Sequence, residues 1–194
     1  MASPVTCPSC RALFAIPPDT DHFGLLGLPR ASKVEESRLQ SAHRALSRAV
    51  HPDRFVGQGD DTSALAVTLS AALNEAYAVL ADPLRRADYL LMRAGGPSAM
   101  EERGVPGSLL AEVMMLREEI DVAREVDDRA TLERMRGELT DRRRKAMANV
   151  ELQVEQIDRL TEAQRYDVRR ALNSLKYLDN LLVQAQETAP AQEL

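Results

Sequence analysis

Apolar residues recur at helical spacing along most of this 194-residue chain, and Gly and Pro residues separate the runs. One run covers residues 33–50, where the apolar positions fall in a stripe about 100° wide on a helix. The members of this stripe are Leu39, Ala42, Leu46, Ala49 and Val50. A second run begins near Ser63, and one side of it carries Leu65, Leu69, Ala72, Leu73, Ala76 and Leu80. The pattern predicts two nearly antiparallel helices that pack along these sides.

Shorter helices flank this predicted hairpin. One contains the stretch FGLLGLP and ends at Pro29. Another follows Asp82 and Pro83, because proline disfavours helical torsions in the residue before it and aspartate is a good N-cap. His43 lies at the edge of the apolar stripe on the 33–50 helix, where we expect it to pack, whereas Arg44 and Arg48 lie together on the opposite, solvated face.

Three longer helices are expected between residues 108 and 188. Ser108 is the expected N-cap of the first, and Asp127 and Asp128 mark the start of the second. Thr161 and Gln164 form a capping box for the third. The apolar stripes of the second and third helices contain Leu132, Met135, Leu139, Ala146, Val150, Ile157, Val168, Leu172, Leu175 and Leu182. Helices with such stripes form a bundle.

The punctuation between these runs predicts the domain organisation of an all-α protein. Residues 1–20 are an irregular leader that contains a CxxC sequence, and residues 21–94 form the first helical domain. Gly and Pro residues at 95–107 indicate a linker. Residues 108–188 form a C-terminal three-helix bundle, and residues 189–194 are expected to fray.

Composition narrows the class of protein. Apolar residues make up 44% of the chain and the net charge is −5, so there is no positive field to indicate a nucleic-acid partner. The basic residues at 142–145 point in different directions on a helix and are expected to be solvated. We see no run of about 18 apolar residues and no signal pattern, so we expect a cytoplasmic protein without a membrane partner. Two cysteines make no disulfide framework.

The tripeptide His51-Pro52-Asp53 interrupts the helical pattern between the two hairpin helices. A catalytic histidine would need a nucleophile and an oxyanion site, yet the chain has no nucleophile elbow, glycine-rich phosphate loop or HExxH motif. For the tripeptide alone, the simplest interpretation is a helix that ends at a proline. We therefore expect no enzyme.

The surrounding sequence gives the tripeptide another meaning. FGLLGLP, HRALSRAV, HPDRF and LNEAYAVLADPLRRADYLL follow one another as in the J-domain of DnaJ-type co-chaperones, which residues 21–92 resemble. The resemblance implies four helices, with His51, Pro52 and Asp53 in an exposed turn that stimulates ATP hydrolysis by a DnaK/HscA-type chaperone. It also implies that Arg44 and Arg48, together with Arg54, meet an acidic ATPase. His43 stands where the family usually has tyrosine, and Arg48 lies one position before the common basic site.

The helix after Ser108 is apolar on two sides. Leu109, Val113, Leu116, Ile120 and Ala123 form one side, the expected core. Leu110, Met114 and Val122 lie on the other with Glu118, flanked by Ala111 and Met115. Such surplus apolar surface is buried against another domain or binds a partner, a role for which methionine is adaptable. Tyr177 lies nearly opposite the stripe of its helix and could join this patch.

LREEID and SLKYLDNLL in this half resemble the C-terminal bundle of the HscB family of J-proteins, which serves iron–sulfur cluster biogenesis. The resemblance implies that this bundle binds an IscU-like scaffold while the J-domain recruits HscA. The matching positions are Leu110, Met114, Met115, Glu118, Val122 and Tyr177. Ala111 is smaller than the usual residue, and Val122 replaces an acid. A J-protein whose bundle holds other clients or dimerises is the alternative, and the chain is expected to be a monomer or a weak dimer.

CPSCRAL in the leader is similar to half of the four-cysteine zinc site that precedes the J-domain in eukaryotic HscB proteins. A structural zinc ion takes four ligands, and Cys7 and Cys10 supply two. Three interpretations stay open: a relict of the site without metal, a zinc or other metal ion shared between chains, and a redox pair. No resident cofactor is otherwise expected.

Overall fold

The computed structural model describes residues 5–7 and 9–186, which are helical apart from one isolated β-bridge and the connecting segments. This confirms the predicted all-α fold. The chain divides into two compact units, Met1–Arg86 and Ala87–Leu194, called below the N-terminal and C-terminal units, and the division falls within helix α4. The elements in order are α1 (His22–Leu25), α2 (Glu36–Val50), η1 (Pro52–Arg54), α3 (Asp60–Ala81), α4 (Pro83–Arg93), α5 (Gly107–Glu125), α6 (Arg129–Glu155), η2 (Ile157–Arg159) and α7 (Glu162–Gln186).

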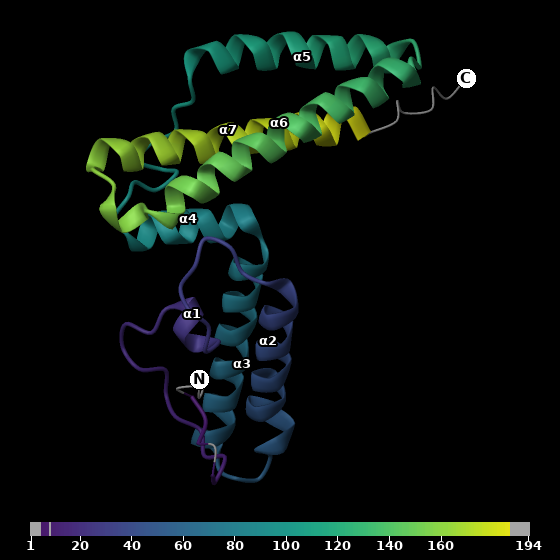
Figure 1. Cartoon of the computed structure of the whole chain (residues 1–194). Helices are drawn as coiled ribbons and strands as arrows, with labels where there is room; N and C mark the ends of the chain where they lie inside the picture. Colours follow the sequence, from purple (N-terminus) through teal and green to yellow (C-terminus); the bar gives the residue numbers. More distant parts are fainter. Residues whose placement is uncertain (1–4, 8, 187–194) are drawn as a thin grey trace. The chain divides into compact units, whose positions relative to one another are not determined.

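The N-terminal unit is built on the hairpin of α2 and α3, which run side by side with α1 against α3 (Figure 1). The predicted stripes face each other, with Leu39 and Val50 of α2 and Leu69, Leu73 and Leu80 of α3 buried. At the edge of the α2 stripe, the His43 ring stacks on the Tyr77 ring with centroids 4.4 Å apart. The imidazole Nε2 of His43 also lies 2.9 Å from Oδ1 of Asn74, so His43 packs as expected.

Helix α3 begins earlier than its sequence indicates and is unusually apolar. It starts at Asp60 rather than near Ser63, because Gly59 takes a left-handed backbone (φ 99°) and its carbonyl accepts from the amide of Ser63. By length and composition alone, α3 could cross a membrane. Its buried residues pack within the N-terminal unit, and the core helix of a soluble protein passes the same test.

The leader forms a small turn that packs by its buried Val5. Thr6 and Leu13 form the isolated antiparallel bridge, and the amide of Cys7 donates to the carbonyl of Ala12 at 2.9 Å. The amide of Arg11 donates back to the carbonyl of Cys7, also at 2.9 Å. These bonds fix the path of the chain on both sides of the CxxC sequence.

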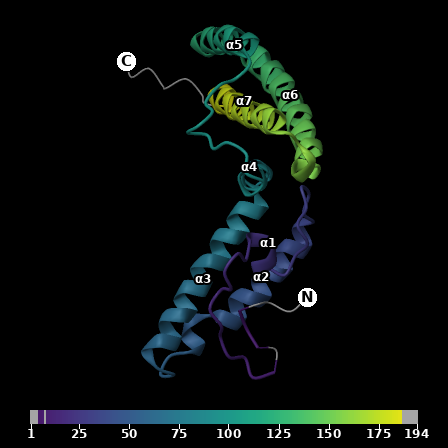
Figure 2. The ribbon, with the colours of Figure 1, turned by 90° about the vertical axis from the view of Figure 1, so that its left-hand side faces the viewer.

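The C-terminal unit contains the three predicted long helices. Helix α6 packs along α7, and α5 lies against both, as the two views of Figures 1 and 2 show. The hydrophobic core of the C-terminal unit contains Leu109, Val113, Ile120, Met135, Leu139, Leu178, Leu181 and Ala185. Ile157 is buried but lies in η2 rather than in α6, which ends at Glu155. The expected tail, residues 189–194, lies outside the described residues.

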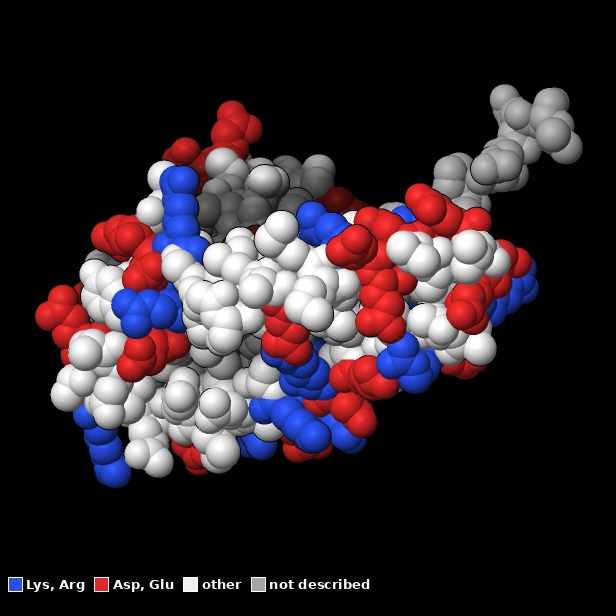
Figure 3. Space-filling view, turned by 90° about the horizontal axis from the view of Figure 1, so that it is seen from above, with Lys and Arg blue, Asp and Glu red and all other residues white. Residues whose placement is uncertain are grey.

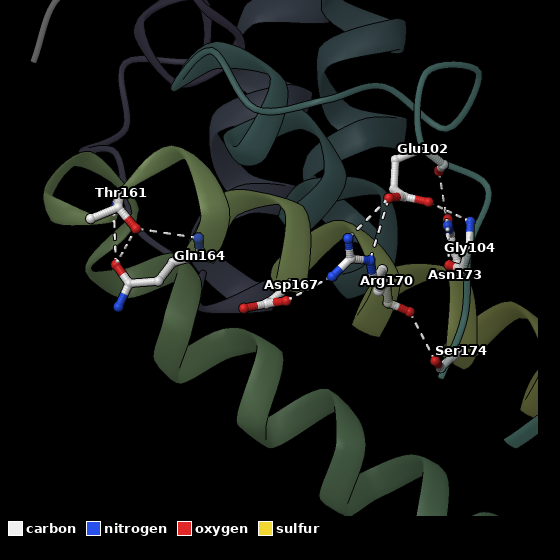
Figure 4. A network of polar contacts seen from close by, with 8 residues as sticks. All are labelled: Glu102, Gly104, Thr161, Gln164, Asp167, Arg170, Asn173 and Ser174. Atoms are coloured by element: carbon white, nitrogen blue, oxygen red, sulfur yellow. Dashed lines mark hydrogen bonds and ion pairs between the residues drawn. The ribbon is translucent and has the colours of Figure 1, made fainter. Parts of the chain in front are cut away.

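Most helix starts follow the predicted caps. Asp82 accepts from the amides of Leu84 and Arg85 at 2.7 and 3.0 Å. Thr161 and Gln164 form the reciprocal capping box, drawn in Figure 4, with amide-to-oxygen distances of 2.8 and 3.3 Å.

The expectation that Ser108 caps α5 is wrong. The helix begins one residue earlier, at Gly107, and Pro106 occupies the N-cap position without a side-chain cap. The chain already turns at Pro106, whose carbonyl accepts from the amide of Leu109 at 2.9 Å. Ser108 therefore lies inside the first turn.

The segment at 95–107, expected as a linker, is held on α7 (Figure 4). Asn173, which is buried, donates from Nδ2 to the carbonyls of Glu102 and Gly104, each at 3.0 Å. Arg170 pairs with the Glu102 carboxylate at 3.3 Å. This segment is thus part of the C-terminal unit's packing.

Candidate functional site

The tripeptide between α2 and α3 forms a short, exposed 3₁₀ turn. Pro52 starts η1, the amide of Arg54 donates to the carbonyl of His51 at 3.0 Å, and that of Phe55 donates to Pro52 at 2.9 Å. The buried Phe55 anchors the turn to the hairpin. The side chains of His51 and Asp53 remain 57% and 86% exposed. The turn therefore presents an imidazole and a carboxylate on a rigid backbone.

The arrangement does not fit a catalytic pair. His51 Nδ1 accepts a hydrogen bond from the amide of Asp53 at 3.3 Å, and the Asp53 carboxylate lies 3.7 Å from the same nitrogen. Within the described part of the chain, no serine or cysteine side chain is hydrogen-bonded to His51. Exposed on the turn, and with no serine or cysteine hydrogen-bonded to His51 among the described residues, the pair is suited to contact another molecule.

The three arginines expected to meet a partner are exposed and close to this turn in the sequence. Arg44 is oriented along α2 by a hydrogen bond from Nη2 to Oε1 of Gln40 at 2.8 Å. Arg54 donates from Nη1 to the carbonyl of Arg48 at 3.2 Å, which ties the turn to the last turn of α2. These three residues place positive charge on the exposed face of α2 and on the turn itself.

In the C-terminal unit, the second apolar side of α5 is exposed. Leu110, Met114, Met115 and Val122 are 45%, 72%, 71% and 55% exposed. Figure 3 looks down on this helix and shows uncharged side chains over it with acidic ones among them. We call Leu110, Met114, Met115, Glu118 and Val122 the α5 patch. The packing of the unit leaves these side chains uncovered.

Charges around the α5 patch are mostly neutralised. Glu112 pairs with Arg142. The hydrogen bond between them lowers the pKa of the Glu112 carboxyl and raises the pKa of the Arg142 guanidinium. Glu119 pairs with Arg134 at 2.7 Å. Within the described residues no ion pair is formed by Glu118, which leaves one solvated carboxylate in the middle of the patch.

Tyr177 lies differently from the rest of the predicted set. It is partly buried and packs against the hydrophobic core of the C-terminal unit together with Leu182. Its placement in the α5 patch stays a prediction. Sequence reasoning missed Val126, which is 69% exposed beyond the end of α5. With Met115 and Val122 it lines a hollow of about 400 Å³ that continues the patch toward Thr131.

Cys7 and Cys10 are both free thiols, Cys7 half-buried and Cys10 exposed. The amide of Cys10, and then that of Ser9, hydrogen-bond to the Cys7 sulfur and lower the pKa of that thiol. Amide donors of this kind favour a thiolate, the form that binds metal. Among residues 5–7 and 9–186, however, no group of three or more His, Cys, Asp or Glu residues is placed to hold a metal ion. Further ligands would have to come from elsewhere.

Comparison with known proteins matches both units. Residues 21–89 match the DnaJ domain family, and residues 105–186 match the HSCB C-terminal oligomerisation domain. The chain is 36% identical over 130 residues to the co-chaperone protein HscB homolog of Burkholderia mallei (strain SAVP1), covering 66% of this chain and 74% of that protein. It is 36% identical over 102 residues to the co-chaperone protein HscB of Proteus mirabilis, covering 52% of this chain and 59% of that protein.

A solved structure extends the match over both units. Chaperone HscB from Vibrio cholerae superimposes with a TM-score of 0.73 at 30% identity, covering 86% of this chain and 95% of that one. The exposed HPD turn, the C-terminal bundle and these relatives agree, and the chain belongs to the HscB family of J-domain co-chaperones.

Proposed function

We propose that this co-chaperone stimulates ATP hydrolysis by an HscA/DnaK-type chaperone and delivers to it an IscU-like scaffold protein, so promoting iron–sulfur cluster assembly and transfer. The N-terminal unit acts on the ATPase through His51, Pro52 and Asp53, with Arg44, Arg48 and Arg54 as supporting contacts. The α5 patch holds the scaffold. The protein itself catalyses no reaction and works in the cytoplasm.

The observation that carries this proposal is the exposed turn between α2 and α3. A proline-started 3₁₀ turn on a packed hairpin holds the His51 and Asp53 side chains in water with little further ordering needed on binding. Contact with the ATPase therefore costs little conformational entropy. The nearby arginines attract an acidic surface over a distance of about one Debye length, so the contact is expected to weaken with salt.

The α5 patch supports the scaffold part of the proposal. Its exposed methionines and aliphatic side chains form an adaptable surface, and Glu118 offers one carboxylate for a basic or hydrogen-bond-donating group. Residue 122 is a valine where the family usually has an acid, so Glu118 is not joined by a second carboxylate and the patch is more apolar. A folded protein with a complementary apolar surface is a suitable partner.

A steady-state ATPase assay tests the proposal. The cognate chaperone should turn over ATP faster when this protein is added, and faster again with scaffold present. His51→Gln should remove the stimulation, whereas Arg38→Glu, an exposed charge on the far part of α2, should keep it. Unchanged chaperone turnover with the wild-type protein would falsify the J-domain role.

A second candidate function is a general J-protein whose C-terminal unit holds other clients or dimerises. It is favoured by the description of the matched C-terminal family as an oligomerisation domain and by the uncovered α5 patch. Sedimentation velocity on the purified chain separates the two. A dimer that persists at micromolar concentration and is dispersed by alanine at Met114 supports self-association through the patch, whereas a monomer that binds scaffold supports the first proposal.

A further inference from the structure

The turn of the leader and the HPD end of the hairpin enclose a pocket within the N-terminal unit. Its volume is about 540 Å³, and it is lined by Cys10, Arg11, Ala12, Leu13, Ala49, Arg54, Phe55, Gln58, Thr62 and Leu65. Its apolar side chains come from the leader, α2, α3 and Phe55, and its polar side chains come from the leader, from Arg54 and Gln58 after the tripeptide, and from Thr62 of α3. The pocket thus lies next to Arg54, a residue of the proposed chaperone contact.

The charge of this lining has one sign. Among the described residues, Arg11 and Arg54 are the charged residues of the lining, and none of the lining residues is acidic. Arg54 donates one hydrogen bond from Nη1 to the carbonyl of Arg48, and its guanidinium has further N–H donors. Two arginines beside apolar side chains in one pocket match a carboxylate on a short methylene stem, the side chain of an aspartate or glutamate.

The leader holds Arg11 at this pocket in a strained conformation. Its φ is 62°, in the left-handed region that favours glycine, and its amide is fixed to the carbonyl of Cys7. The bridge between Thr6 and Leu13 closes the same turn. A residue with a side chain is disfavoured at such a position, and backbone strain of this kind is concentrated at binding sites.

From this geometry we infer that the pocket is an additional docking site for the ATPase partner, in which Arg11 and Arg54 bind an acidic side chain of the chaperone. The leader turn then belongs to the chaperone-binding surface, and its contact is continuous with the tripeptide through Arg54. The inference rests on the proposed function, because the same partner occupies both contacts. It gives the leader a role that needs no bound metal.

Titration of the chaperone's ATPase with the full-length protein tests the inference. Arg11→Glu should raise the concentration of co-chaperone needed for half-maximal stimulation about fivefold or more and leave the maximal rate unchanged, since binding weakens while the tripeptide stays intact. Arg11→Lys should titrate close to wild type. Arg38→Glu is the matched control: Arg38 is an exposed arginine of α2, about 20 Å along the helix from His51, and its reversal should change the titration less than twofold.

A second experiment does not depend on charge reversal. In a Cys7→Ser background, maleimide coupled to Cys10 should fill the pocket and raise the half-maximal concentration in the same way. Circular dichroism must show unchanged helicity for each protein. If the Arg11→Glu variant and the Cys10 adduct both give the same titration curve as the wild-type protein, this inference is overturned and the proposed function is not. A wild-type protein that fails to stimulate the chaperone overturns the proposed function, and this inference with it.

Discussion

The guanidinium of Arg169 in α7 is fully buried and pairs through Nη2 with the carboxylate of Asp88 in α4. Its Nε also donates to the carbonyl of Pro97 at 2.9 Å. One buried cation therefore fixes the middle of α4 and the start of the 95–107 segment to the bundle. Since a buried charge without a partner is strongly unfavourable, this pair specifies how these three parts meet.

Replacement of Arg169 by alanine should destabilise the C-terminal unit by about 2–3 kcal/mol. This is below the cost for a fully buried pair, because Asp88 keeps 34% of its side chain in water. Hydrogen exchange of α7 amides, measured by mass spectrometry, reports the local free energy of opening. Arg144→Ala is the control, since its ion pair with Asp141 is exposed and should contribute less than about 1 kcal/mol. Equal effects of the two substitutions would contradict the role assigned to Arg169.

Sequence periodicity could not identify this pair. Arg169 follows Val168, a predicted core position, and an arginine beside an apolar stripe is ordinarily solvated. Arg86 is a parallel case in the N-terminal unit, where it is buried and donates to the carbonyls of Ser32 and Leu80. Each arginine has a carbonyl or carboxylate acceptor far away in the sequence, Ser32 for Arg86 and Asp88 for Arg169. Only the tertiary fold brings such acceptors together, so local patterns carry no signal for them.

Asp128 should make the stability of α6 depend on pH. Its carboxylate accepts from the amide of Thr131 at 3.1 Å and from the hydroxyl of that residue at 2.7 Å, which lowers the pKa of Asp128 in the folded chain. The unfolded chain then takes up the proton first as pH falls. The stabilisation is complete above the unfolded pKa and is lost as pH falls through the folded pKa.

An Asp128→Asn variant isolates this effect, because asparagine also caps helices but does not titrate. Hydrogen exchange of the first turns of α6 should show the wild type more protected near neutral pH. The difference should shrink steadily between about pH 5 and pH 2, the range in which aspartates with lowered pKa values titrate. A difference that stays constant over this range contradicts the assignment.

Caps of this kind were the most predictable features of the fold. Asp82, Asp128 and the Thr161–Gln164 pair were all expected from sequence, because each bonds to residues at most three positions away. Ser108 had the same local signature and failed, because Pro106 and Gly107 start the helix before it. The ion pair of Arg143 with Asp179 was missed, since the run at 142–145 was expected to be solvated and the partner lies on another helix.

Cys7 should react faster with alkylating reagents than Cys10 near neutral pH. The amides of Cys10 and Ser9 lower the pKa of the Cys7 thiol, and the thiolate is the nucleophile. Peptide mass spectrometry after brief iodoacetamide treatment measures both rates as a function of pH, and the Cys7 profile should rise at lower pH. Equal pH profiles for the two thiols contradict the amide assignment.

Metal analysis of the same sample tests a shared zinc site: less than about one zinc ion per two chains excludes it.

The α5 patch was the part of the candidate site that sequence described best. Two apolar sides on one helix can be counted in the sequence, and the structure buries Val113 and Ile120 while leaving Met114 and Val122 exposed. The extension to Val126 escaped notice because that residue follows the helix, where helical periodicity no longer applies. The identity of the partner is a property of two surfaces, and one sequence contains only one of them.

Simultaneous replacement of Leu110 and Met114 by alanine should weaken capture of an IscU-like scaffold by more than about tenfold, since central apolar anchors each contribute about 1 kcal/mol or more to an interface. Both side chains are exposed in the free protein, so stability should change little. Isothermal titration calorimetry measures the affinity.

Leu152→Ala with Val183→Ala is the matched control, because both residues are exposed aliphatic side chains, on α6 and α7, outside the patch. Undiminished affinity of the Leu110/Met114 variant would place the scaffold elsewhere on the chain, and equal losses in both double variants would show that binding depends on general apolar exposure. Stimulation of the chaperone without scaffold should be the same for all these proteins, because the tripeptide is untouched.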